Sequence, residues 1–549
     1  MAENEKKPQR RRWRRLLLGL LLVVLAGWWT LDWWREPEII ISPETTFLTG
    51  PLDADGNVDY AAALNEMASE GVTPENNAVV LLVQAMGPEW GVTEVFGPGE
   101  RKARSLPSEF YKNMGISKPP TDGDYFVDLH DFCKTKENRE NVAAGTISDT
   151  VHDQLDVAII RPWESEQYPH LAEWLKQNEK PLELIAEASR RSRCHVPLES
   201  GKLLGRTAIA IDGFWCVIEA FCVRAMLRAS AGDVEGACAD VIAGRRLAAL
   251  VRQHPTTFAN LSYVILESVT CRTQRALVHF CDLPEEWYER LAQPCSDMPP
   301  GRSLAGLLAT GTRFEALQIA TTLARGADAE LRREMEDANV REPHDWNDVL
   351  RQINGHFDHL VTAALEAEIS PRLDLLRSIK NSQRPLTLNP RRIPVVHGLL
   401  DFIGVKHHGK QPTDPLDFCI PVTVYWAQST SDTGKIRRDF ARLALYLGAY
   451  RADHGQYPAK LADLVPDYLP GLPKDLYAPG PYRYRLTSEG CLLYSVGLNG
   501  QDDNGRNAMY EMDESLPADA DDIPLHMPPK LEEHLVEEPE PEEPASEKQ

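Results

Sequence analysis

The chain has 549 residues, of which 43% are hydrophobic, and its formal net charge at pH 7 is −23. Because compact domains mostly run to about 100–200 residues, this length allows two to four domains with real hydrophobic cores. A general nucleic-acid binder needs an excess of Lys and Arg to neutralise phosphates, so the acidic balance argues against nucleic acid as a partner.

The first 34 residues have the features of a membrane anchor. Residues 16–31, LLLGLLLVVLAGWWTL, are uncharged, and with their flanks they are long enough to cross a hydrocarbon core about 30 Å thick. Tryptophans stand on both sides of the run, as in the aromatic belts of membrane proteins. The alternative is a cleaved signal peptide, but bulky Trp follows the run where cleavage needs small residues. We therefore expect a transmembrane helix at 16–34.

The charge around this anchor predicts its orientation. Residues 1–35 carry eight Lys or Arg and three acidic residues, and such a cationic flank stays in the cytoplasm. The rest of the chain is correspondingly more acidic, which favours solubility. We expect a basic cytoplasmic segment at 1–15 and a single pass through a bacterial inner (cytoplasmic) membrane, with the bulk of the chain in the periplasm.

A linker at 35–57, rich in Pro, Gly and Asp, precedes a helical ectodomain predicted at 58–384. Apolar residues at helical spacing predict helices at 60–69, 76–86, two within 163–192, about 214–226, 234–252, about 258–281 and about 344–380, the last kinked or split at Pro371. The predicted fold class is therefore mainly α.

Gly232 and Asp233 separate two strongly helical segments, which predicts an α-hairpin. The pattern from Ala225 through Gly232–Asp233 to Ala237 resembles a tetratricopeptide-like unit. A solenoid needs about three stacked repeats to bury its faces, and one such unit is visible. A helical bundle is therefore favoured over short tetratricopeptide-like hairpins, and both remain open.

The C-terminal part has a different organisation. A linker is predicted at 385–435, where periodicity is lost, and a small α+β module at 436–527. The module begins with an amphipathic helix at 436–453, followed by a short helical turn at 461–464 and a sheet of two or three strands that includes 482–486 and 492–496. The Pro- and Glu-rich tail at 528–549 is predicted to be disordered.

The order of residues in this module carries a resemblance. The relevant positions are Tyr450, Asp453, Gly455, Tyr457, Pro458, Leu461, Leu464, Pro473, Asp475, Tyr482, Tyr484, Tyr494, Ser495, Gly497, Asn499 and Gly500. Together they resemble the C-terminal module of the type II secretion major pseudopilin, which implies a pseudopilin-like α+β fold. The chain departs from that family in one respect: a pseudopilin carries its membrane helix directly before the module, and here the predicted anchor lies about 400 residues upstream.

The same resemblance implies a calcium loop, because pseudopilins bind calcium near this end of the module. The equivalent oxygen-rich residues are Asn499, Gln501, Asp502, Asp503 and Asn504. Calcium takes roughly six to eight oxygen ligands, which Asp and Asn side chains and backbone carbonyls supply. The alternative is a polar turn between Gly500 and Gly505. Calcium is the only cofactor that the sequence suggests.

Other groups of metal-capable residues form no recognisable site. Residues 53–59, DADGNVD, lack the glycine position and the final Glu of an EF-hand, so an Asx turn before a helix is expected. The groups around His130 and around His356 and His359 lack a third ligand. The ten cysteines make no C-x-x-C pair, and disulfide pairing stays open.

Catalytic motifs are also missing from the sequence: there is no G-x-S-x-G, no Walker loop and no G-x-G-x-x-G after a strand. No catalytic residue is therefore predicted. Stretches such as GVTPENNAVVLL and YSVGLNGQDDNG resemble uncharacterised membrane-anchored proteins of planctomycete-type bacteria, a family without an assigned activity. That resemblance implies organisation and localisation.

These observations predict a non-enzymatic, single-pass envelope protein that acts as an interaction or assembly platform for protein partners. One alternative is a component of a type II secretion-like apparatus, to which the displaced anchor is an objection. A second alternative is a periplasmic hydrolase whose site carries no recognisable motif.

Overall fold

The computed structural model describes residues 39–365, with gaps at 89, 98–99, 107, 141–142, 144, 201–206, 210, 300, 338–339, 341 and 344, and residues 423–507 and 520–530. The predicted cytoplasmic segment, the anchor at 16–34 and most of the acidic tail lie outside the described residues. Within the described ranges, no helix combines the length and the apolar character needed to cross a membrane.

The described chain is mainly helical, as the sequence predicts, and it contains two small sheets. The helices are α2 (Tyr60–Ser69), α3 (Val79–Met86), α4 (Ser108–Asn113), α5 (Leu129–Glu140), α6 (Thr146–Ala158), α7 (Pro169–Gln177), α8 (Glu179–Ser189), α9 (Ile211–Ser230), α10 (Val234–Val251), α11 (Thr257–Phe280), α12 (Glu285–Ala292), α13 (Leu304–Ala309), α14 (Gly311–Ala324), α15 (Ala329–Asp337), α16 (Trp346–Leu365) and α20 (Thr423–His454), with a 3-10 turn at Leu461–Leu464.

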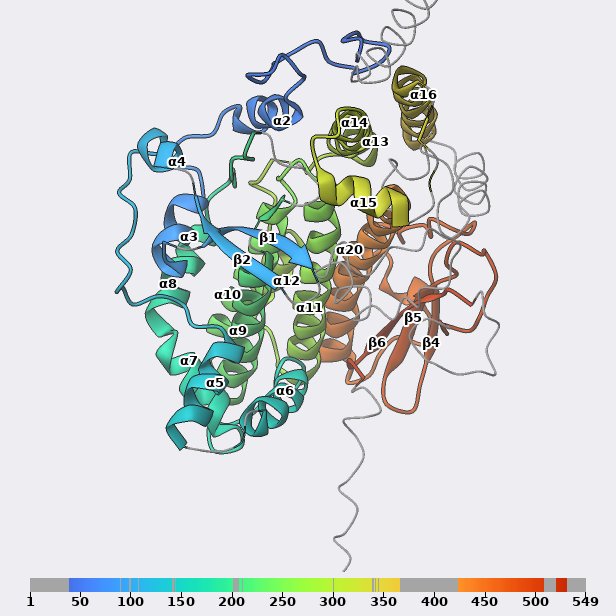
Figure 1. Ribbon diagram of the computed structural model, residues 1–549. Coiled ribbons are helices and arrows are strands. Elements are labelled where there is room, and N and C mark those ends of the chain that lie inside the picture. The colour runs from blue at the N-terminus through green and yellow to red at the C-terminus, as the bar shows by residue number, and fades with distance from the viewer. Residues whose placement is uncertain are drawn as a thin grey trace, which may run out of the picture.

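Four long helices, α9, α10, α11 and α20, lie side by side at the centre of the molecule (Figure 1). The predicted hairpin between α9 and α10 is confirmed: Gly232 adopts a positive φ of 79°, which favours glycine, and the Asp233 side chain caps α10 by accepting a hydrogen bond from the Gly236 N–H. Both local signals were readable in the sequence because they concern neighbouring residues.

Helix α20 begins at Thr423, so residues 423–435, which the sequence places in a linker, are helical. It runs parallel to α11. Gly434 lies against Val264, the Gln274 side chain donates a hydrogen bond of 2.9 Å to the Ala441 carbonyl oxygen, and Gly448 lies against Val278. Small residues on α20 allow this close approach. The Ser-, Thr- and Gly-containing stretch before residue 436 has weak helix propensity, and packing against α11 outweighs that propensity.

One hydrophobic core runs through the central helices and the C-terminal module. It contains Trp163, Trp174 and Phe221 from the body together with Phe440 of α20 and Leu493 of the C-terminal sheet. The predicted boundary between ectodomain and module therefore coincides with no break in the apolar packing. The division of the chain into those domains remains a prediction.

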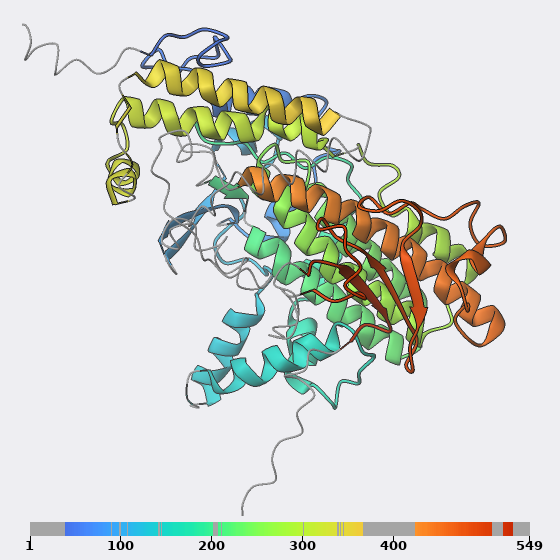
Figure 2. The same cartoon turned by 90° about the vertical axis from the view of Figure 1, so that its right-hand side faces the viewer.

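A second core lies at one end of the bundle, where α14 and α16 lie side by side (Figure 2). Its largest members include Tyr60, Phe314 and Trp346. The predicted apolar stripe of α16 is confirmed, since Leu350 and Phe357 are fully buried. Pro371, at which a kink or split was predicted, lies outside the described residues.

The two sheets are both three-stranded and antiparallel. In the first, β2 (Glu100–Ser105), β1 (Gly91–Gly97) and β3 (Thr207–Ile209) pair in that order, and sequence analysis did not predict it. In the second, β4 (Arg483–Leu486), β5 (Cys491–Ser495) and β6 (Ile523–Met527) pair in that order against α20. This confirms the predicted β4–β5 hairpin, and of the two or three strands that were expected the structure has three. The nine cysteines of the described chain are free thiols.

Candidate functional site

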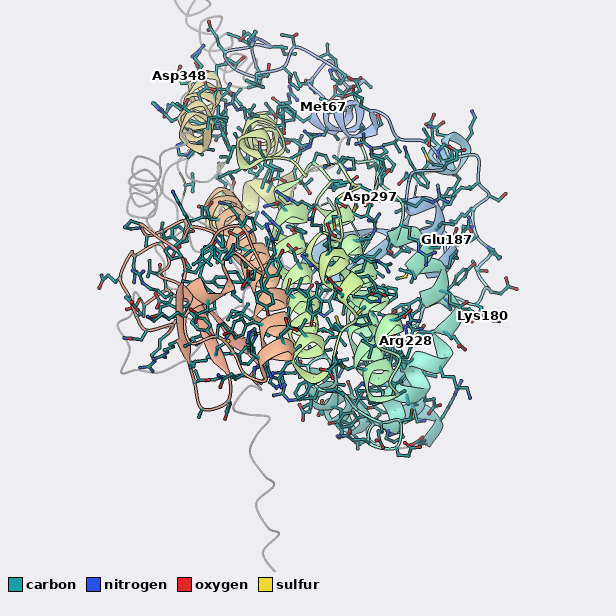
Figure 3. The ribbon with its side chains drawn as sticks, turned by 180° about the vertical axis from the view of Figure 1, so that it is seen from behind. Met67, Lys180, Glu187, Arg228, Asp297 and Asp348 are labelled. Carbon is teal, nitrogen blue, oxygen red and sulfur yellow. The ribbon has the colours of Figure 1, made fainter. Side chains whose placement is uncertain are left out.

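A cleft of about 550 Å³ lies between α8, α9, α10 and α12. In Figure 3, Asp297 and Arg228 lie towards opposite ends of α8, which Glu187 and Lys180 mark. The charged residues that line the cleft are Glu183, Arg190, Arg224, Arg228, Asp240, Arg246, Arg290 and Asp297. Five guanidinium groups against three carboxylates give the cleft a positive excess in a chain whose net charge is −23.

The floor of the cleft is a buried ion-pair network around Asp240, whose side chain is 3% exposed. Arg224 donates two hydrogen bonds to the carboxylate, at 2.9 and 2.6 Å, and Arg228 donates a third at 2.9 Å. Arg224 and Arg228 are one helical turn apart on α9, so both reach the same carboxylate on α10. Arg228 also lies 3.7 Å from the Asp233 carboxylate, so the two cations of the floor are paired with two anions.

Arg246 lines the cleft and contacts the end of α8 and the segment at 294–297 that follows α12. Its guanidinium donates to the backbone carbonyls of Ser189, Arg190 and Pro294 and makes a two-point ion pair with the Asp297 carboxylate. The Ser189 and Arg190 carbonyls belong to the C-terminal end of α8, where a cation is favoured by the helix dipole. Arg246 therefore has a structural role.

Arg190 and Arg290 are exposed at the rim, together with the carboxylates Glu183 and Asp297. Within the described part of the chain, neither of these two guanidinium groups makes an ion pair or hydrogen bond. The Arg290 guanidinium stacks over the Trp287 ring, 3.8 Å from its centroid, and this contact orients the group. Guanidinium groups present forked N–H donors that match carboxylate and phosphate oxygens, so the rim is suited to an anionic ligand.

The predicted calcium loop is held mainly by its own hydrogen bonds. The Asn499 amide nitrogen donates to Asp503 at 3.0 Å, and the Asn499 side-chain oxygen accepts from the Gln501 N–H at 2.7 Å. The Asp502 carboxylate accepts from the Asn504 N–H and the Tyr494 hydroxyl, both at 3.0 Å. These bonds are those of a polar turn.

Sequence analysis missed two acidic residues that the fold brings to this loop, Asp521 and Asp522. Asp521 accepts from the Asn499 N–H, and Asp522 accepts from the Gly505 N–H at 2.7 Å while its second carboxylate oxygen is buried without a partner. Even so, among the described residues no three His, Cys, Asp or Glu side chains converge as metal ligands. Calcium binding at this loop stays a prediction.

The raised pKa of Asp522 predicts how the stability of the folded protein depends on pH. Burial, followed by the nearby Asp503 and Asp502 carboxylates, raises the pKa of Asp522 to about 7, against about 3.9 for an unfolded Asp. The folded protein therefore binds this proton more tightly, and the contribution of Asp522 to stability falls as pH rises from about 4 to 7. We expect Asp522→Asn to raise the melting temperature at pH 8 by about 2–4 °C and to do so less at pH 5. Exposed Asp467→Asn is the matched control, and a loss of stability at pH 8 in Asp522→Asn would contradict the assignment.

Two of the remaining metal-capable groups contain acidic residues with structural contacts. The Asp53 carboxylate accepts from the backbone N–H groups of Asp55 and Asn57 at 2.9 and 2.8 Å, which confirms the Asx turn. Beside the buried Phe357, Asp358 pairs with Arg313 at 2.6 Å. The cleft itself was not predicted, since its arginines are dispersed between residues 190 and 290 and follow no motif.

Comparison with known proteins found no matching family model, no similar curated protein and no similar solved structure.

Proposed function

We propose that this chain is a non-enzymatic, single-pass envelope protein whose helical body serves as an interaction platform on the periplasmic face of a bacterial inner membrane. The observation that supports it is the arginine-lined cleft. In an acidic chain, two exposed guanidinium groups that meet no carboxylate among the described residues, on the rim of a 550 Å³ cleft, present a local binding surface of opposite sign.

The chemistry of the cleft favours an acidic segment of a partner protein. Charged groups line its rim and floor, and its walls include Ala186, Ala239 and Ile242. A segment that alternates Asp or Glu with small apolar residues would match the charged rim and the apolar walls. Its carboxylates would meet Arg190 and Arg290, and its apolar atoms would cover the alanines. The protein partner is therefore proposed by its chemistry.

The packing of α20 favours the function of an interaction platform and argues against that of a filament subunit. One side of this helix is covered by α11 and α12, and another by the β4–β5–β6 sheet (Figure 1). A pilus subunit packs through its long helix, and here that helix is engaged within its own chain. The pseudopilin-like module is thus proposed as a reused fold that is built into the body, and the secretion-apparatus alternative is less well supported.

Charge reversal at the rim tests the proposal. We expect Arg190→Glu with Arg290→Glu to lower the recovery of crosslinked partners by roughly tenfold, equivalent to about 1.4 kcal/mol, because attraction to an acidic segment becomes repulsion. The measurement is in-cell crosslinking of the full-length chain, purification through an N-terminal tag, and quantitative identification of the crosslinked peptides.

The matched control is Arg333→Glu, an exposed arginine on α15 outside the cleft. Crosslinks that map to acidic peptides and disappear only in the rim variant would support the proposal. An identical set of partners from the wild-type and rim-variant proteins would contradict it. Recovery of pseudopilins or secretion-ring proteins would instead favour the alternative apparatus function.

A further inference from the structure

The chain leaves the C-terminal sheet at a fixed point of the helical body. Two residues after β6, the carbonyl oxygen of the buried Pro529 accepts a hydrogen bond of 3.1 Å from the Arg161 guanidinium. The same guanidinium stacks over the Phe280 ring at the end of α11, 5.1 Å from its centroid. The exposed Lys530 follows, and after it residues 531–549, LEEHLVEEPEPEEPASEKQ. We call 531–549 the acidic segment, because it contains eight glutamates and one lysine.

A chain of hydrogen bonds connects this point with the cleft. Trp163, two residues after Arg161, is fully buried, and its carbonyl oxygen accepts a hydrogen bond of 2.5 Å from the Ser230 hydroxyl at the end of α9. Its indole N–H donates to the Val223 carbonyl oxygen of the same helix at 3.0 Å. Arg228, which lines the cleft, lies two residues before Ser230. The acidic segment therefore starts at the end of the bundle where Arg228 borders the cleft.

The acidic segment is long enough to reach and fill the cleft. Helix α9 packs directly against α11, and packed helices lie about 8–10 Å apart, so a path of two helix spacings is about 20 Å long. Helix α8, which borders the cleft, has 11 residues and is about 16 Å long. The 19 residues of the acidic segment span about 60 Å when extended. The rim arginines at 190 and 290 therefore lie within its reach.

The composition of the acidic segment matches the lining of the cleft. Leu535 and Val536 directly precede Glu537 and Glu538, so apolar side chains and carboxylates stand together, as the apolar walls and the charged rim require. Carboxylates accept the forked N–H donors of the two rim arginines. Prolines within 539–544 restrict the backbone, so less conformational entropy is lost when the segment is ordered in the cleft.

We propose that the acidic segment binds in the arginine-lined cleft of its own chain and competes there with the acidic segment of a partner protein. This inference rests on the proposed function of the cleft and adds an intramolecular competitor to it. A tethered ligand is present at an effective concentration of about 1 mM, so a segment that binds with a Kd of about 0.1 mM occupies the cleft in roughly nine chains of ten. A partner protein has to displace it.

The test measures binding of a fluorescein-labelled peptide with the sequence of residues 531–549 to the full-length chain in mild detergent. The variant replaces all eight glutamates of the attached segment with glutamine. We expect this glutamine variant to bind the peptide roughly tenfold more tightly than the wild type does, because the competing segment is lost. The ratio of the two affinities should not depend on chain concentration. A ratio that changes with concentration would place the segment in the cleft of a second copy and overturn the proposal.

Charge reversal at the rim separates binding in the cleft from a general effect of net charge. In the Arg190→Glu, Arg290→Glu background, neutralising the segment should change the peptide affinity by less than about twofold, whereas Arg333→Glu should leave the gain intact. Equal affinities of the wild type and the glutamine variant, with binding still lost on rim reversal, would overturn this inference and leave the proposed function of the cleft standing. Peptide binding that is indifferent to rim reversal would contradict both.

Discussion

Replacing Glu267 with alanine is expected to destabilise the folded protein by about 3–5 kcal/mol. Glu267 is 5% exposed on α11, and its carboxylate lies 3.3 Å from the Arg245 guanidinium of α10 and 3.9 Å from that of Arg438 on α20. Arg245 is itself 6% exposed, so the substitution would leave a buried cation with neutral partners only. The carboxylate thus joins three central helices.

Urea unfolding of the variant measures this loss, with exposed Glu289→Ala as the control. The double variant Glu267→Met with Arg245→Met should recover part of the lost stability, because it removes the buried Arg245 cation and fills the space with apolar side chains, while Arg438 keeps its hydrogen bond to the Tyr263 hydroxyl. A loss below about 1 kcal/mol in Glu267→Ala, or a double variant less stable than the single one, would show that the pair does not hold the helices.

The second large effect is expected at Gly448, where α20 passes closest to α11. A Cβ atom at this position would lie 1.9 Å from Cγ1 of Val278, and the branched valine has little freedom to turn away. Gly448→Ala should therefore push the helices apart and destabilise the protein by about 1–3 kcal/mol, even though alanine has the higher helix propensity. Adding Val278→Ala makes room for the new methyl group.

A double-mutant cycle tests this contact. The pair Gly448→Ala with Val278→Ala should be more stable than the sum of the single effects by about 0.5–3 kcal/mol, since the clash exists only when both side chains are large. Tryptophan fluorescence is a suitable probe because the module from 436 to 527 contains no Trp. If the helical body and the module share one core, Gly448→Ala should shift the unfolding transition of the body, as followed by tryptophan fluorescence. An unchanged transition would indicate that the module unfolds separately.

Helix α8, which borders the cleft, lies on the opposite flank of the bundle from the β4–β5–β6 sheet (Figure 1). The rim of the cleft is exposed and suits a protein segment.

The sequence alone determined those features that depend on neighbouring residues. The hairpin at Gly232–Asp233, the apolar stripe of α16, the Asx turn at Asp53 and the β4–β5 hairpin each rest on a cap, a period or a turn residue within a few positions. These local signals establish the mainly helical class. The membrane anchor and the pseudopilin-like resemblance also come from sequence and remain predictions.

Only the tertiary structure decided which distant charges meet. The length of α20 depends on packing against α11, and the first sheet joins β1 to a strand more than a hundred residues later. Arg190, Arg228 and Arg290 line one cleft only after the helices are packed. Charged side chains carry no period that marks them as buried or paired, because their energy depends on the groups around them in space, and sequence spacing does not specify those groups.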